Sequence, residues 1–92
     1  MSNIELERFI DQMIELAGEK GYRPTEFIKM RDRYQTVEAI SRLVVSGDIQ
    51  SGFRRLNELE LRDWTIEAAV LKYSNEFTPA VFECAKFRLS LI

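Results

Sequence analysis

Apolar residues recur at steps of three and four along most of this chain, and that period constrains the fold more than any other feature. Such steps return to one face of an α-helix, whereas a half-buried strand needs alternation at every second residue. That alternation never lasts long enough here to indicate a strand. The chain has 92 residues, 46% of them apolar, which suffices for one modest core. We therefore expect an all-α fold, a compact bundle of five to six short helices in a single domain over residues 1–92.

Capping and breaking residues mark where these helices begin and end. Ser2 and Glu5 fit a capping box that starts a helix of about 17 residues, and Gly21 is expected to end it. Pro24 suits the first turn of a second helix that ends near Arg33 or Tyr34. Further helical segments are expected to begin at a Thr36 cap, at 51–53, at an Asp63 or Thr65 cap, and at Pro79 after a Thr78 cap. Helices this short depend on packing for their stability.

The last helix carries two apolar sectors. At 100° per residue, one sector suits the domain core and holds Val81, Phe82, Ala85, Leu89 and Ile92. A nearly opposite sector holds Ala80, Cys84, Phe87 and Leu91. Such a helix is either buried on both sides or presents one side to a partner. A chain cut from a larger parent would show the same exposed stripe.

Self-association is the sharper interpretation of the second sector, because a domain this small has little interior to cover a terminal helix on all sides. We expect a homodimer with twofold symmetry, or docking of a protein partner, through Ala80, Cys84, Phe87 and Leu91. Phe87 and Leu91 are the expected anchors, since large desolvated side chains dominate interface energies.

Charge is distributed unevenly along the chain. Residues 1–19 contain five acidic residues and one Arg, while residues 20–55 contain eight basic residues and four acidic ones. Nucleic-acid contact is the alternative function, and it would use Arg23, Lys29, Arg31 and Arg33 beside Tyr22 and Tyr34. The overall charge of −2 argues against it. The acidic first helix could equally pair with the basic middle of the chain.

The residue inventory excludes several chemistries. With no His and Cys84 as the single Cys, a zinc site made by the chain alone and a His-dependent catalytic triad are both impossible. We expect no cofactor, no catalytic residues and no enzymatic activity. A lone Cys indicates a reducing, cytoplasmic location. The longest apolar runs have three residues, which predicts no membrane span.

Several strings occur together in a characteristic order, namely 21–27 (GYRPTEF), 51–56 (SGFRRL), 65–71 (TIEAAVL), 77–79 (FTP) and 85–89 (AKFRL). Over residues 20–90 the chain resembles a small helical module of mostly uncharacterised bacterial proteins, which occurs alone or at the C-terminal end of longer chains. The resemblance implies an all-helical fold and supplies no known catalytic residue.

Two positions depart from that module. It commonly has a Gly-Gly-like turn before its third helix, where this chain has 33–35 (RYQ), so we expect that turn to be built differently. Its last helix is usually charged on the outward side, which Phe87 and Leu91 occupy here. The sequence therefore predicts a non-enzymatic protein-interaction module that acts through its C-terminal helix.

Overall fold

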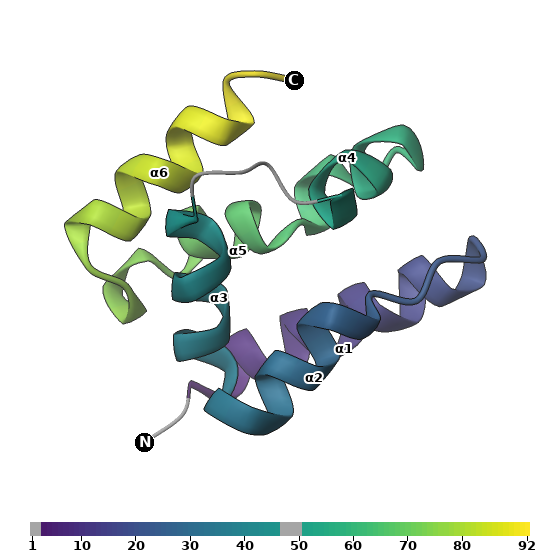
Figure 1. The fold of residues 1–92 in the computed structure, drawn as a ribbon, viewed down its shortest axis with the longest axis horizontal. Helices are drawn as coiled ribbons and strands as arrows, with labels where there is room; N and C mark the ends of the chain where they lie inside the picture. Colours follow the sequence, from purple (N-terminus) through teal and green to yellow (C-terminus); the bar gives the residue numbers. More distant parts are fainter. Residues whose placement is uncertain (1–2, 47–50) are drawn as a thin grey trace.

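The computed structural model describes residues 3–46 and 51–92, and these form helices and turns without a strand (Figure 1). Two 3-10 turns, η1 (Arg62–Trp64) and η2 (Ser74–Glu76), flank α5. The α-helices are α1 (Ile4–Glu19), α2 (Thr25–Tyr34), α3 (Thr36–Val45), α4 (Ser51–Glu58), α5 (Ile66–Lys72) and α6 (Pro79–Leu89). The all-α prediction with five to six short helices is confirmed.

Asn3 caps the first helix, one residue later than the sequence analysis expected. Its Oδ1 accepts hydrogen bonds from the backbone N–H groups of Glu5 (2.9 Å) and Leu6 (3.1 Å). The expected cap, Ser2, lies outside the described residues. At the other end of α1, Gly21 has a φ of +84°, the left-handed conformation predicted for the residue that ends this helix.

The other described boundaries follow the local signals with two differences. Thr65 and Thr78 cap α5 and α6, because each hydroxyl accepts a hydrogen bond from the backbone N–H three residues later. Pro24 precedes α2 as its N-cap instead of forming its first turn. Thr36 was expected to cap α3, but it is the first residue of that helix and its hydroxyl donates to Glu7 on α1. The sequence 46–48 (SGD) predicts a break after the third helix. Helix α3 ends at Val45, and of these three residues only Ser46 is among the described residues.

Gln35 forms the turn between α2 and α3 with φ +70° and ψ 174°. Only glycine adopts this backbone region without strain, which costs other residues about 1–3 kcal/mol. The turn therefore keeps a conformation suited to glycine although the sequence offers none there.

Gln35→Gly should accordingly raise the free energy of unfolding by about 1 kcal/mol, after allowance for the extra freedom that glycine gives the unfolded chain. Gln12→Gly is the matched control, because Gln12 is exposed within α1, and there glycine should cost about 1 kcal/mol. Urea unfolding of both variants checks the opposite signs. Equal losses in the two variants would show that Gln35 is not strained.

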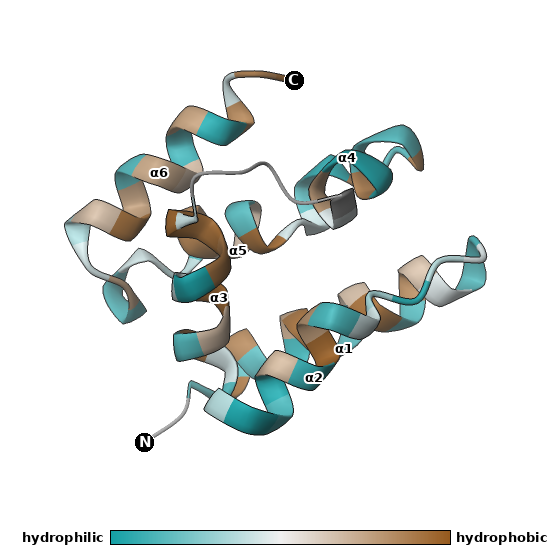
Figure 2. Cartoon of the chain, viewed as in Figure 1, coloured by the Kyte–Doolittle hydropathy of each residue, from teal (hydrophilic) through white to brown (hydrophobic). Residues whose placement is uncertain are grey.

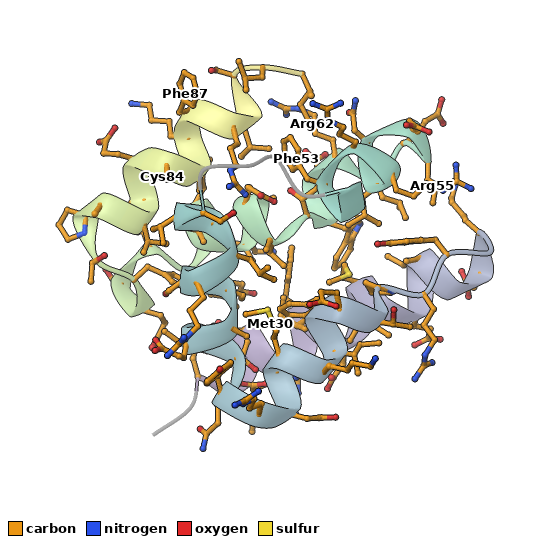
Figure 3. All side chains as sticks on the ribbon, in the orientation of Figure 1. Met30, Phe53, Arg55, Arg62, Cys84 and Phe87 are labelled. Carbon is orange, nitrogen blue, oxygen red and sulfur yellow. The ribbon has the colours of Figure 1, made fainter. Side chains whose placement is uncertain are left out.

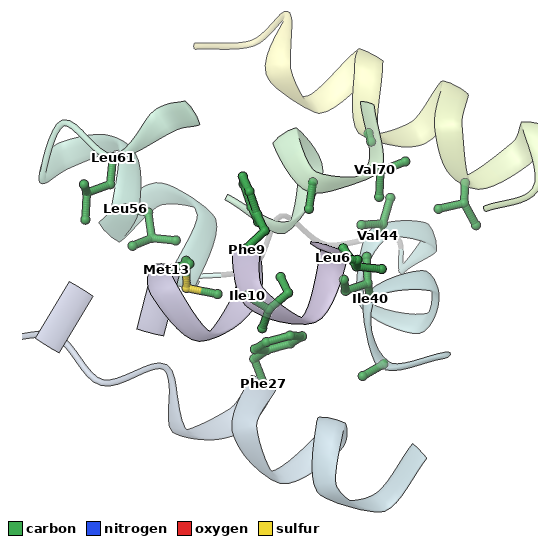
Figure 4. Packing of buried hydrophobic residues seen from close by; sticks show 14 of the residues in the cluster. Leu6, Phe9, Ile10, Met13, Phe27, Ile40, Val44, Leu56, Leu61 and Val70 are labelled. Carbon is green, nitrogen blue, oxygen red and sulfur yellow. The ribbon is translucent and has the colours of Figure 1, made fainter. Parts of the chain in front are cut away.

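Buried side chains from all six described α-helices form one core (Figure 4). It contains Leu6, Phe9, Ile10, Met13, Ala17, Phe27, Ala39, Ile40, Val44, Leu56, Leu61, Ala69, Val70, Val81 and Ala85. Phe9 of α1 also stacks on Trp64 of η1, with 4.8 Å between ring centroids. Each helix therefore contributes an apolar stripe to a shared interior, as short helices require.

Helix α6 lies at the edge of this assembly, next to α3 and α5 (Figure 1). Hydrophobic residues recur along the whole of α6, whereas α2 is mostly hydrophilic (Figure 2). Arg62 of η1 supports the end of α6, because its Nη2 donates to the carbonyl oxygen of Leu89 at 3.0 Å. That bond satisfies a C-terminal carbonyl and places a cation at the negative end of the helix dipole.

Candidate functional site

One side of α6 belongs to the core. Val81, Ala85 and Leu89 are buried there, in agreement with the predicted inner sector. Phe82 is half-buried. Ile92 was also assigned to that sector, but it is 41% exposed. The reason is that the α-helix ends at Leu89, so Ile92 lies beyond the point where helical periodicity applies.

The opposite side forms an apolar surface, which we call the α6 outer face and define as Ala80, Cys84, Phe87 and Leu91. Phe87 is 65% exposed and Leu91 is 50% exposed. Cys84 is half-buried and Ala80 is exposed. Figure 3 shows Phe87 pointing away from the other helices. Within the described chain, Phe87 and Leu91 therefore lie outside the core, and the alternative of a helix buried on both sides does not hold for them. Cys84, by contrast, packs against the core.

Leu91 lies beyond the last residue of the α-helix, in a tightened turn. Its N–H donates to the carbonyl oxygen of Arg88 at 3.0 Å, three residues earlier. One exposed charge, Glu83, lies on α6 beside the outer face, whereas Lys86 lies further round the helix, toward η1 and α5. The face thus has an apolar centre with a carboxylate at one border.

A buried ion pair holds α6 against α5, and the sequence analysis did not anticipate it. Arg88 Nη1 donates to Glu67 Oε2 at 3.0 Å, and the two residues are 4% and 1% exposed. Arg88 Nη2 also donates to the carbonyl oxygen of Ser46 at 2.8 Å. Burial raises the pKa of Glu67, and the nearby backbone N–H of Glu67 itself and Arg88 offset this only in part. The sequence contains one sign of this buried position. On a helical wheel, Arg88 lies apart from the side of α6 that holds the other polar residues.

One of the four residues expected to form a cationic surface for nucleic-acid binding, Arg31, is paired within the chain. Arg31 faces α1, where it forms ion pairs with Glu7 (2.6 Å) and Asp11 (2.7 Å), and its Nε donates to Thr36. Burial alone would lower the pKa of Arg31, but these two carboxylates raise it, so the guanidinium stays charged.

The other three predicted contact residues, Arg23, Lys29 and Arg33, are exposed. The guanidinium of Arg33 lies 5.3 Å from the ring centre of Tyr34. Glu7 and Asp11 of α1 already bind the guanidinium of Arg31 and balance its charge, so this group is not placed to bind phosphate. Pairing between the acidic first helix and the basic middle of the chain therefore accounts for part of the uneven charge.

The described residues contain no helix long and apolar enough to cross a bilayer. They also contain no group of three or more acidic or Cys side chains that could hold a metal ion. Searches of protein-family models, of curated proteins and of solved structures found no match to this chain.

Proposed function

We propose that this chain is a non-enzymatic, cytoplasmic protein-interaction module that pairs with a second copy of itself through the α6 outer face. The exposure of Phe87 and Leu91 on a helix whose other side is already buried is the observation that carries this proposal. Covering an apolar face is favourable, because burial contributes about 25 cal/mol of stabilisation for each Å² of apolar surface removed from water.

The order of side chains along the face favours a copy as the occupant. The small residues Ala80 and Cys84 lie in its first half, and the large residues Phe87 and Leu91 lie in its second half. Two antiparallel copies related by a twofold axis therefore place the large half of each face against the small half of the other. That match lets the helices approach closely without leaving a gap.

The size of the α6 outer face determines how strongly we expect two copies to associate. Helix α6 has 11 residues, so it is about 17 Å long. A contact based on one such helix is smaller than a standard stable interface, which buries roughly 800 Å² on each partner. We therefore expect a reversible dimer with a dissociation constant in the micromolar range.

Light scattering and sedimentation should show a mass that rises from 10.8 kDa toward twice that value, as concentration increases from about 1 µM to about 1 mM. Phe87→Glu should weaken association at least about tenfold, because each interface would then bury two carboxylates. Ile4→Glu is the matched control, since Ile4 is 66% exposed on α1. It should leave association unchanged.

Cys84 offers a second readout, because the chain has a single Cys and it lies near the expected twofold axis. At a chain concentration near the dissociation constant of the parent, a short bis-maleimide should link the two copies through this thiol in the parent chain and in Ile4→Glu, and much less in Phe87→Glu. Circular dichroism verifies that all variants fold. A chain that stays monomeric throughout, or a dissociation constant that Phe87→Glu leaves unchanged, would refute the proposal.

A further inference from the structure

A cavity of about 110 Å³ is lined by residues of helices α1 to α5. Its wall is mostly apolar and includes Met13, Phe27, Leu43, Phe53, Leu56 and Ile66. Phe53 is labelled on α4 in Figure 3. Glu26, which is exposed, marks the side where the cavity opens to solvent. This volume is about three quarters of that of an engineered apolar cavity of about 150 Å³ that binds benzene, so a single small ring is the upper limit of what the cavity can hold.

One polar group in this wall has unused hydrogen-bonding capacity. Glu67 lines the cavity and is 1% exposed, and its Oε2 accepts a hydrogen bond from Arg88. Among the described residues, its Oε1 has no hydrogen-bond partner although it is buried. Buried polar atoms are nearly always paired, so a buried carboxylate oxygen without a donor indicates a missing group.

The chemistry of the wall identifies that group. The polar side chains of the wall are Tyr22, Glu26 and Glu67, and the rest of it is apolar, so a molecule with an apolar body covers more of the wall than a water does. A cationic ligand is disfavoured, because Arg88 already balances the charge of Glu67 and a second cation would be buried without a counterion. A neutral apolar molecule with one N–H or O–H donor satisfies both the wall and the oxygen.

We propose that this cavity binds a small neutral molecule of single-ring size, whose apolar body packs on Phe27, Phe53 and Leu56 and whose single donor bonds to Glu67 Oε1. Tyr22 and Gly52 close one part of the wall. A Cβ at Gly52 would lie 2.9 Å from the Tyr22 hydroxyl, so the absence of a side chain lets the ring approach the α4 backbone. This site uses none of the residues of the α6 outer face.

Three probes of similar size distinguish the contribution of the hydrogen-bond donor to binding from that of the apolar ring. Pyrrole has an N–H donor, benzene has no hydrogen-bonding group, and pyridine has only an acceptor. We expect pyrrole to bind saturably near 1 mM, and at least about tenfold more tightly than pyridine, whose lone pair would face a carboxylate oxygen. Benzene should fall between them. The readout is amide chemical shifts, which should move at Phe53 and Leu56.

Glu67→Gln provides the decisive variant because it preserves the shape of the side chain. Its carbonyl oxygen would take the hydrogen bond from Arg88, which leaves the amide NH₂ toward the cavity in place of an acceptor. The preference should therefore reverse, so that pyridine binds more tightly than pyrrole. Recording both titrations in the Phe87→Glu background separates this result from self-association.

Three results would overturn the proposal. The first is a lack of saturable shifts with pyrrole in a folded chain, as expected if only water occupies the cavity. The second is equal affinity for all three probes. The third is an unchanged preference in Glu67→Gln.

Discussion

Replacing Arg88 with methionine should lower the free energy of unfolding by about 3–5 kcal/mol. The side chain of Arg88 is almost fully buried, and it supplies the cation that balances the buried carboxylate of Glu67. Methionine fills similar space but leaves that charge uncompensated. A domain of 92 residues has only about 5–14 kcal/mol of stability in total, so urea unfolding should show a large drop in midpoint.

The loss should depend on pH, because Glu67 can give up its charge. Burial already raises the pKa of Glu67 above its ordinary value of 4.5. At a pH between the pKa of Glu67 in the unfolded chain and its pKa in the folded chain, the folded chain keeps a proton on Glu67 that the unfolded chain has lost. The contribution of Glu67 to stability is therefore complete below pH 4.5, and it is lost as the pH rises through the folded pKa. Removing Arg88 raises the pKa of Glu67 further, so Glu67 stays protonated in the folded chain up to a higher pH.

The difference in unfolding free energy between Arg88→Met and the parent chain should therefore shrink from about pH 7 to about pH 5. Taking the difference cancels the titration of the other carboxylates. The double variant Glu67→Met/Arg88→Met should recover most of the loss, because an apolar pair replaces a desolvated ion pair. A pH-independent loss, or a double variant as unstable as the single one, would show that the ion pair does not act in this way.

Ile10→Ala should cost about 3 kcal/mol, because it leaves a cavity at the centre of the core. Ile10 is fully buried, and Figure 4 shows it beside Phe27 of α2. For a domain of this size such a loss lowers the melting temperature by about 12–24 °C.

Ile4→Ala is its control, since Ile4 lies on the same helix but is 66% exposed. That change should alter stability by less than about 0.5 kcal/mol. Calorimetry or thermal circular dichroism measures both variants. Similar melting temperatures would mean that α1 does not pack into the core through Ile10.

The helices and most of their boundaries were predictable because their signals are local. The apolar period, the caps at Thr65 and Thr78 and the stop at Gly21 each act within a few residues. Errors occurred where a neighbouring residue could serve as well, as with Asn3 in place of Ser2. Thr36 was assigned to a cap because its contact with Glu7 on α1 cannot be read from nearby sequence.

The candidate site was predictable only in part. Periodicity grouped Ala80, Cys84, Phe87 and Leu91 and assigned the opposite sector to the core, but it could not tell whether the second sector would be buried as well. Glu67, missed by the sequence analysis, looks like an ordinary exposed residue of a short helix until α6 covers it.

The sequence by itself determined an all-helical chain, the limits of most helices and a last helix with two apolar sectors, because hydrogen bonds and side-chain spacing within a helix depend on near neighbours. Only the tertiary structure decided that Arg88 reaches Glu67 from 21 residues away and that Arg31 pairs with α1. It also decided that Phe87 stays outside while a cavity remains beside Glu67. These outcomes depend on how separate helices pack, and packing joins residues whose separation in the chain carries no local signal.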